Sequence, residues 1–284
     1  MKTITHRSKL PLADLFDVDL STPGPRVEGG RAMSPWILRS LVASFAFSGL
    51  LGCFGNSSRG ARATPPVAAR ATTLRVLYGL KPPTEVVPAH TALVLVDFQD
   101  EFVHGRLPVA DPARAIAHAA DLVRWARANG LLVVHVRNVS SRPESPIFAP
   151  SSPTIEIVPE LRPAADGREQ IVTKSSGGAF TKTGLDTLLR SAGIDTLVVA
   201  GIMTQLAVDS SARDATVLGY HVVVASDACT TRPLRDIDGG IVDAVTVQRV
   251  ALAALADRFA DVMPTSKIIG LPLARVVASS TAAR

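Results

Sequence analysis

From about residue 90, short runs of apolar residues alternate with longer segments in which apolar and polar positions mix. Residues 91–96 (TALVLV) form a continuous apolar run that ends at Asp97, as expected of a strand buried on both faces of a parallel sheet. Similar runs predict strands at residues 131–136, 171–173, 196–200, 221–225 and 261–263. Strands that alternate with helices predict a single-domain α/β fold, with a three-layer, doubly wound, Rossmann-like arrangement around a mostly parallel sheet.

The segments between these runs carry the signals of helix ends. Asp111 and Pro112 suit an N-cap and a first helical position, and this helix is predicted to stop at Gly130. Further helices are predicted at residues 183–192, 204–218 and 241–259. Residues 138–170 are rich in Ser and Pro and too long for an ordinary connection, so we expect a loop or lid on the substrate side.

An N-terminal part of different character precedes the alternating region. Residues 1–32 are polar and aperiodic, which predicts a disordered extension, and residues 54–72 read as a Ser-, Arg-, Ala- and Pro-rich linker. Between them, residues 33–53 hold an apolar run of about a dozen residues, too short to span a bilayer comfortably. We therefore expect the folded domain at residues 73–273, followed by a short tail at residues 274–284.

The segment at residues 33–53 ends in the sequence LLGC, which resembles a bacterial lipobox with Cys53 as the lipidated residue. This interpretation predicts a lipoprotein signal that starts at Met33, and a membrane tether in the bacterial cell envelope. The alternative is a short amphipathic or buried segment within an N-terminal extension, which would leave the protein in the cytoplasm.

The formal net charge of +5 comes from the N-terminal part alone. Residues 1–70 carry 9 basic and 4 acidic residues, whereas the rest of the chain carries 21 of each. The predicted domain therefore has no overall basic field, which argues against nucleic acid as a partner. The two cysteines and six scattered histidines form no disulfide framework and no metal-ligand spacing, so we expect neither a metal nor a cofactor.

Charged residues follow two of the predicted strands. Asp97 ends the strand at residues 91–96, and Lys174 ends the strand at residues 171–173. A turn follows Gly201 at the end of a third strand. Because parallel sheets bind ligands at the carboxyl ends of their strands, near the point where the strand order reverses, these residues predict one shared site.

Three blocks of sequence occur in the order known from one family. They are VLVDFQDEF at residues 94–102, IVTKSSGGAF at residues 171–180, and GIMTQLAVDSSARDATVLGYHVVVASDACTT at residues 201–231. Together they resemble the isochorismatase-like superfamily, often called the cysteine hydrolases, over about residues 90–268. The resemblance implies a hydrolase that acts on a small molecule, and we also expect a homo-oligomer.

The resemblance assigns catalytic roles to the two charged residues. Asp97 would transfer protons, although a carboxylate at a strand end can also cap a helix or serve in a salt bridge. Lys174 would keep that carboxylate ionised and polarise a substrate oxygen, although it could also be a surface lysine at a strand exit.

Four further residues are predicted to bind substrate. Gln99 shares a side with Asp97 and either orients substrate or hydrogen-bonds the backbone, and Phe102 closes the same block. The resemblance implies a cis peptide before Met203, which would aim the backbone N–H groups of Met203 and Ala207 into an oxyanion hole. Thr204 is expected mainly as a helix N-cap.

Alanine at position 207 is the departure from the family pattern, because most members have their catalytic cysteine there. Alanine offers no nucleophile, so the covalent mechanism is excluded. Two hypotheses remain: hydrolysis of an amide or a vinyl ether by a non-covalent Asp/Lys mechanism, or a pseudoenzyme kept for ligand binding or subunit contact.

Other reactive side chains are given structural roles. Cys229 is read as a small packing residue, His135 as a satisfied core histidine, and Arg213 and Asp214 as ion-pair or cap residues. The nicotinamidase relatives bind a metal through an Asp and two His after the first block. Residues 105–109 (GRLPV) contain no such motif.

Overall fold

The structure is a computed structural model that describes residues 72–274. The predicted disordered extension, the predicted signal segment with Cys53, and nearly all of the predicted linker and tail lie outside these residues. Within residues 72–274, no helix combines the length and the apolar character needed to cross a membrane.

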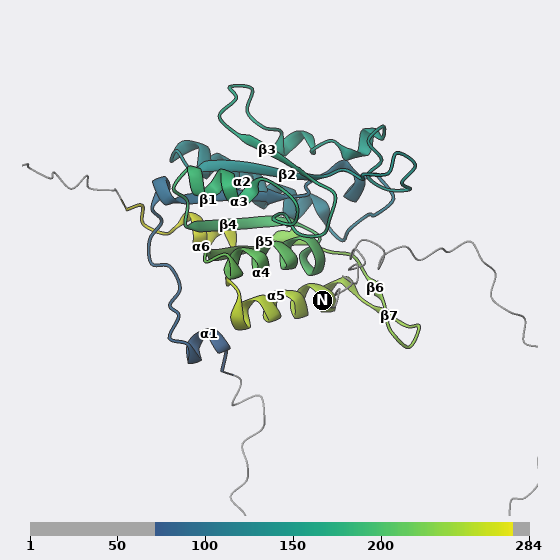
Figure 1. Cartoon of the computed structure of the whole chain (residues 1–284). Coiled ribbons are helices and arrows are strands. Elements are labelled where there is room, and N and C mark those ends of the chain that lie inside the picture. Colours follow the sequence, from purple (N-terminus) through teal and green to yellow (C-terminus); the bar gives the residue numbers. More distant parts are fainter. Residues whose placement is uncertain (1–71, 275–284) are drawn as a thin grey trace, which may run out of the picture. The chain divides into compact units, whose positions relative to one another are not determined.

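Six parallel strands form the central sheet, in the order β3-β2-β1-β4-β5-β8 (Figure 1). Every neighbouring pair in this order is parallel, which confirms the predicted doubly wound α/β fold. The strands are β1 (Thr91–Val96), β2 (Leu132–Asn138), β3 (Gln170–Lys174), β4 (Thr196–Ile202), β5 (His221–Thr230) and β8 (Asp261–Met263). The residues of β1 are all buried, as a continuous apolar run requires of a central strand.

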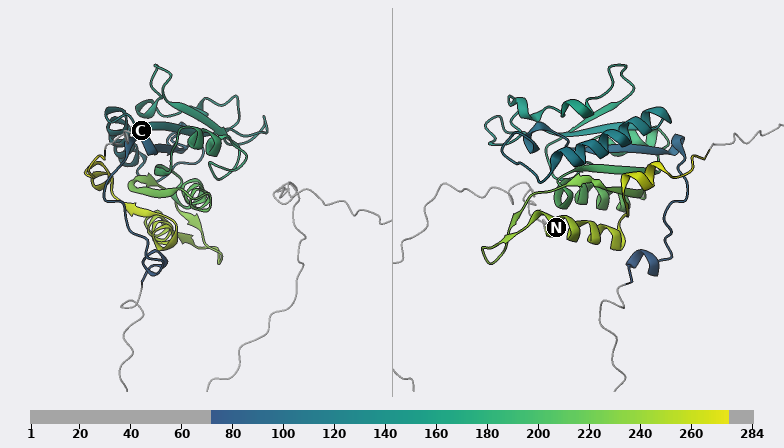
Figure 2. Two further views of the ribbon diagram at one scale, coloured as in Figure 1. Left: turned by 60° about the vertical axis from the view of Figure 1, so that its left-hand side comes forward. Right: turned by 180° about the vertical axis from the view of Figure 1, so that it is seen from behind.

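Helices cover both faces of the sheet. One face packs against α2 (Pro112–Ala128) and α6 (Thr265–Ile269), and α2 lies in front of the sheet in the view from behind (Figure 2). The other face packs against α3 (Leu185–Ser191), α4 (Asp209–Val217) and α5 (Ala244–Arg258). The two apolar clusters that result make the three layers of the predicted architecture.

The strand order reverses beside β1. After β1 the chain adds β2 and β3 on one side, and then returns to add β4, β5 and β8 on the other. Neighbouring connections diverge at such a point and leave a crevice at the carboxyl ends of the strands. Gly201 allows β1 and β4 to approach closely there, because a Cβ at this residue would lie 2.4 Å from the carbonyl oxygen of Val96.

Some predicted boundaries were wrong. The predicted helix at residues 241–259 begins only at Ala244, because Asp243 is its N-cap and accepts a hydrogen bond from Thr246 N at 2.9 Å. Residues just before it form the short antiparallel hairpin of β6 (Leu234–Arg235) and β7 (Ile241–Val242). The predicted helix at residues 204–218 begins as a π-helical turn, η7 (Thr204–Val208), before α4.

The long connection between β2 and β3 has two short 3₁₀ turns, η5 (Pro153–Ile155) and η6 (Pro159–Leu161). Ile155 and Leu161 are buried in the same apolar cluster as α2. This packing holds the connection against the domain, at the position where a lid was expected.

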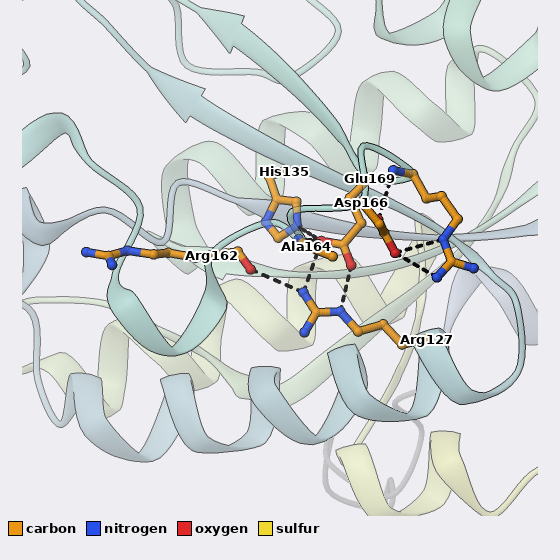
Figure 3. Close-up of polar contacts among 7 residues, drawn as sticks. Arg127, His135, Arg162, Ala164, Asp166 and Glu169 are labelled. Atoms are coloured by element: carbon orange, nitrogen blue, oxygen red, sulfur yellow. Dashed lines mark hydrogen bonds and ion pairs between the residues drawn. The ribbon is translucent and has the colours of Figure 1, made fainter.

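A cluster of polar side chains holds the end of this connection at the start of β3 (Figure 3). The Glu169 carboxylate accepts hydrogen bonds from Arg127 at 2.6 and 3.1 Å and from Ala164 N at 3.1 Å. His135, on β2, lies 2.7 Å from the same carboxylate. We call Glu169, Arg127, His135 and Ala164 the Glu169 cluster.

Candidate active site

A cavity of about 300 Å³ opens at the carboxyl ends of the strands, beside the reversal of strand order. Its lining comes from the ends of β1, β2, β3 and β4, from the π-helical turn η7 and from the connection between β2 and β3. The two charged residues in that lining are Asp97 and Lys174. The predicted site therefore exists as one cavity, and the predicted lid contributes to its wall through Ser140, Ser145 and Phe148.

Asp97 and Lys174 form a buried ion pair at the cavity. Lys174 Nζ lies 2.6 Å from Asp97 Oδ2, and the two side chains are 2% and 4% exposed for Lys174 and Asp97 respectively. Lys174 Nζ also donates to the carbonyl oxygen of Ser176 at 2.9 Å. Asp97 itself has a φ of 55°, in the left-handed region that few residues other than glycine adopt. The two charged residues therefore meet as a pair, although the strands that they follow, β1 and β3, are not neighbours and β2 lies between them.

One oxygen of Asp97 has no partner. Oδ1 is buried and makes no hydrogen bond within the described residues. Burial raises the pKa of Asp97 from 3.8 to about 6, because the cavity solvates the charged carboxylate poorly, while Lys174 opposes that rise. A carboxyl group with a free oxygen and a pKa close to neutrality is suited to taking up and releasing a proton.

The π-helical turn η7 and the residue before it, Met203, form another part of the cavity wall. Met203, Leu206 and Ala207 line the cavity, and the Ile202–Met203 peptide is cis, as the family resemblance implies. The hydroxyl of Ser211 donates to the carbonyl oxygen of Ala207 at 2.6 Å, which fastens the turn to α4. Position 207 therefore presents a methyl group to the same cavity that Asp97 and Lys174 line.

An apolar wall completes the cavity. Phe102, predicted to bind substrate, lines it together with Phe148, and the two ring centroids lie 5.5 Å apart. Leu107 and Ile147 extend this wall. The cavity therefore combines one polar corner with an apolar body, the usual construction of a small-molecule site.

Two of the predicted substrate-binding residues lie outside the cavity lining. Gln99 is fully buried, and its amide bonds the backbone: Nε2 donates to Asn138 O and Ile155 O at 2.9 and 2.7 Å, and Oε1 accepts from Asn138 N at 2.7 Å. Of the two roles left open for Gln99, the structure places it in the backbone-bonding one.

Thr204 also differs from its prediction as a helix N-cap. Its hydroxyl lies 2.6 Å from Gln248 Oε1 and 3.1 Å from Thr230 O, and makes no capping bond to η7. These partners belong to α5 and β5, so Thr204 fastens the turn to its neighbours instead. The predicted cap was wrong because the turn is π-helical and Met203 occupies the N-cap position.

Asn138 is a lining residue that the sequence reasoning missed. It is the last residue of β2, and its Oδ1 atom is buried without a hydrogen-bond partner in the described part of the chain. The sequence feature that could have identified it is a polar residue at the carboxyl end of a strand, the same feature that pointed to Asp97 and Lys174. The predicted strand stopped at residue 136, which hid this equivalence.

Other reactive side chains have structural surroundings. Burial raises the pKa of Cys229 to about 12, which disfavours a thiolate and agrees with a packing role. His135 is paired with Glu169 in the core, as predicted. Arg213 pairs with Asp209 at 2.6 Å, also as predicted. Among residues 72–274, no cluster of His, Cys, Asp and Glu side chains has the arrangement of a metal site.

Residues 91–267 match the isochorismatase domain family. The chain belongs to the isochorismatase-like hydrolase superfamily. An isochorismatase-family protein of Bacillus subtilis, YddQ, is 32% identical over 180 residues, which make up 63% of this chain and 98% of that protein. Maleamate amidohydrolase of Pseudomonas putida is 29% identical over 197 residues, covering 61% of this chain and 87% of its own.

Solved structures of the superfamily share the fold. A crystal structure of an isochorismatase from Pseudomonas putida superimposes with a TM-score of 0.63 at 30% sequence identity, covering 69% of this chain and 98% of that chain. The region that matches the family, residues 91–267, includes all six strands of the sheet and contains Asp97, Lys174 and Ala207.

Proposed function

We propose that this protein hydrolyses a small amide by direct attack of water, with Asp97 as the general base and no covalent intermediate. The observation that carries the proposal is the buried, unpartnered Oδ1 of Asp97, whose other oxygen is held by Lys174 at 2.6 Å. An unsatisfied carboxylate oxygen is costly in a cavity unless a ligand or water uses it. Membership of a hydrolase superfamily, with an amidohydrolase among its relatives, favours the same chemistry.

The reaction begins with a water molecule between Asp97 Oδ1 and the carbonyl carbon of the substrate. Asp97 takes a proton from this water while the water oxygen bonds the carbon and the carbonyl electron pair moves to its oxygen. When the tetrahedral intermediate collapses, the C–N bond breaks and Asp97 returns the proton to the departing nitrogen. The products are a carboxylic acid and ammonia or an amine, and the aspartate is again ionised.

Two other groups stabilise the charges that this reaction creates. Lys174 keeps Asp97 ionised before the reaction, since an ammonium group at 2.6 Å favours the carboxylate. We assign the backbone N–H groups of Met203 and Ala207 to the developing oxyanion, because both residues line the cavity.

Alanine at position 207 removes the covalent route from this scheme. By family resemblance the position belongs to a catalytic cysteine, whose thiolate would attack the amide. Cys229 does not replace it, because this thiol is fully buried and outside the cavity lining. Water is therefore the nucleophile in the scheme, since Ala207 brings no nucleophilic side chain to the cavity wall.

The ionisation of Asp97 separates this proposal from hydrolysis of a vinyl ether. A vinyl ether must first be protonated on carbon, so the carboxyl group would have to act as an acid. With a pKa of about 6, Asp97 is mostly ionised at pH 7, which suits a base. The pseudoenzyme hypothesis requires only binding and gives no reason for an intact acid–base pair.

The test is a screen of small primary amides by thermal shift, followed by measurement of ammonia release from each amide that binds. We expect hydrolysis without a burst of product, and a rate that rises with pH through about 6 as Asp97 ionises. A rate of amide hydrolysis that falls above pH 6 would instead mean that Asp97 acts as an acid, which would overturn its role as the general base. Ligands that bind in the cavity but are never turned over would support the pseudoenzyme.

A further inference from the structure

Large apolar side chains are exposed on the short helix α1 (Leu74–Leu77) and on the residues that follow it. Single exposed apolar residues are common on protein surfaces, whereas a contiguous group marks a surface that contacts a partner or a membrane. The side chains of this group are between 40% and 69% exposed, and we call them the α1 surface: Leu74, Val76, Leu77, Tyr78 and Leu80.

The rest of the domain holds α1 in one orientation. Arg75 is buried, and its guanidinium lies 2.5 Å from Asp261 Oδ2. The N–H of Leu74 donates to Asp257 Oδ1 at 3.0 Å, which ties the start of α1 to the end of α5 (Figure 1). Because Arg75 is the buried residue of this helix, the apolar side chains cannot turn inward without breaking its ion pair. Their exposure is therefore built into the fold.

The chain around α1 is basic. Residues 29–84 contain seven Lys and Arg residues and no Asp or Glu. The carboxylates of Asp257 and Asp261, which contact α1, are bonded to Leu74 N and Arg75, and Lys81, just after the α1 surface, is exposed. Positive charge next to exposed apolar side chains is the combination that binds the surface of a bilayer with anionic lipids.

A second copy of the chain fits this surface less well. In a symmetric dimer the same surface meets itself, so the basic segment of one chain would face that of the other. Like charges that face each other across an interface cost free energy, whereas an anionic bilayer carries the opposite charge.

We propose that the α1 surface docks on a bilayer that contains anionic phospholipid, with its apolar side chains in the headgroup region and the Tyr78 hydroxyl toward water. Asp261 begins β8, so α1 lies near the amino ends of the strands, whereas the cavity opens at their carboxyl ends. Docking through α1 therefore leaves the cavity open to solvent. The proposal is independent of the proposed reaction, because it uses no residue of the cavity lining.

A fluorescent label on α1 tests the proposal in the full chain. Leu77→Cys is labelled with an environment-sensitive nitrobenzoxadiazole dye, in a chain with Cys53→Ser that carries no lipid, and the remaining Cys229 is fully buried. Ile237→Cys is the matched control, because Ile237 is 97% exposed between β6 and β7. We expect vesicles of phosphatidylcholine with about 30% phosphatidylglycerol to raise the fluorescence at position 77 about twofold or more, and to leave it unchanged at position 237.

The other outcomes name other occupants. An unchanged label at position 77 on a chain that sediments with the vesicles would show that another segment, such as the apolar run at residues 33–53, binds the bilayer, and would overturn the proposal. Equal rises at both positions, or no binding to the vesicles, would overturn it as well. A rise at position 77 that follows protein concentration without vesicles would identify a second copy as the partner instead.

Removing the apolar side chains then measures their contribution. Leu77→Ser combined with Tyr78→Ser should lower the partition coefficient of the full chain onto these vesicles by about tenfold or more, because both side chains leave water on docking. Ile237→Ser should leave the partition coefficient unchanged. A double variant that partitions like this control would overturn the proposal.

Discussion

Two carboxylate side chains at opposite ends of the sheet are almost equally inaccessible to solvent, but they have different hydrogen-bond partners. The side chain of Asp97 is 4% exposed and that of Glu169 is 5% exposed. Glu169 lies just before β3, where Arg127, His135 and Ala164 N bond both of its oxygens. Asp97 follows β1, where Lys174 holds one oxygen and the other has no partner.

The pKa values follow the number of donors. Burial alone raises the pKa of any carboxyl group. For Asp97 this effect is larger than the opposing effect of Lys174, and the pKa is about 6. For Glu169, hydrogen bonds from Arg127 and His135 outweigh burial and lower the pKa below its ordinary value. Low solvent exposure therefore does not distinguish a structural carboxylate from a functional one, whereas a carboxylate oxygen without a hydrogen-bond donor does.

Cavity volume does not distinguish the two ends either. A larger hollow of about 450 Å³ lies beside the Glu169 cluster, at the amino ends of the strands. Its described lining contains no buried side-chain atom without a partner, whereas the smaller cavity contains two, on Asp97 and Asn138. We therefore place the chemistry in the smaller cavity.

Neutralising each carboxylate should give the largest contrast in activity. Asp97→Asn removes the general base, and we expect kcat/KM for a primary amide to fall by about 10²–10⁴-fold, which corresponds to about 3–5 kcal/mol. Glu169→Gln removes a carboxylate of the same burial that does not line the cavity, so its kcat/KM should stay within a few-fold of wild type. Similar losses in both variants would mean that Asp97 acts through folding and not through chemistry.

The same pair should show opposite dependence of stability on pH. Folded Asp97 keeps its proton up to about pH 6, whereas an unfolded carboxyl group releases it near 3.8. The unfolded state therefore binds fewer protons in this window, and the stability contribution of Asp97 falls by up to about 3 kcal/mol as pH rises from 4 to 7. Glu169 has a lowered pKa, so its contribution is present above about 4.5 and is lost as pH falls through the folded value.

Urea unfolding from about pH 3 to 7 measures both effects as differences from wild type. The advantage of wild type over Asp97→Asn should shrink as pH rises, and its advantage over Glu169→Gln should shrink as pH falls. Difference curves with the same sign would show that the two environments are equivalent.

The end of the sheet that carries the site was predictable from the sequence, because the signals there are local. A continuous apolar run ending in Asp97, and a strand ending in Lys174, are enough once the sheet is parallel. Alternation of strands and helices predicts the parallel sheet and so one shared end for both residues, whereas their pairing at 2.6 Å across β2 depends on the strand order that the structure shows. The class of fold and the position of the cavity could therefore both be predicted from the sequence.

The finer details were not predictable, because they depend on contacts between distant residues. Gln99 bonds Ile155, 56 residues away in the chain, and nothing in the block around Gln99 shows this. The hydroxyl of Thr204 lies against Gln248 on α5 in the same way. A sequence motif gives the residue type at a position, whereas the partner that decides between substrate and backbone contact comes from tertiary packing.

A cysteine introduced at position 207 tests whether the charges of the cavity shift the pKa of a thiol, and we expect an effect of intermediate size. Ala207→Cys adds a single heavy atom to the wall of the cavity that Asp97 and Lys174 also line, at a packing cost of about 1 kcal/mol. We expect iodoacetamide alkylation to show an apparent pKa at least about one pH unit below the ordinary 8.5, and this depression to vanish with Lys174→Met, which removes the cation that favours a thiolate. Cys53 and Cys229 are replaced in both backgrounds. A thiol that titrates near 8.5 in both would show that the pocket cannot manage protons, in favour of the pseudoenzyme.

The smallest effect should come from weakening the exposed member of the Glu169 cluster. The Arg127 side chain is 40% exposed and holds Glu169 through two nitrogens, whereas His135 is 2% exposed. Arg127→Lys keeps the charge but loses the two-pronged contact, and solvent screens what remains, so we expect a loss of about 0.5–1 kcal/mol in urea unfolding and unchanged activity.

Arg124→Lys, one turn earlier on α2 in an exposed pair with Asp121, should change stability by less than about 0.5 kcal/mol. If Arg127→Lys cost more than about 2 kcal/mol, the exposed guanidinium would be the main support of Glu169. The difference between Glu169 and Asp97 would then come from the cation that each one pairs with, arginine for Glu169 and lysine for Asp97. A small loss would leave the buried donors, His135 and Ala164 N–H, as the reason why Glu169 is structural while Asp97 remains free to react.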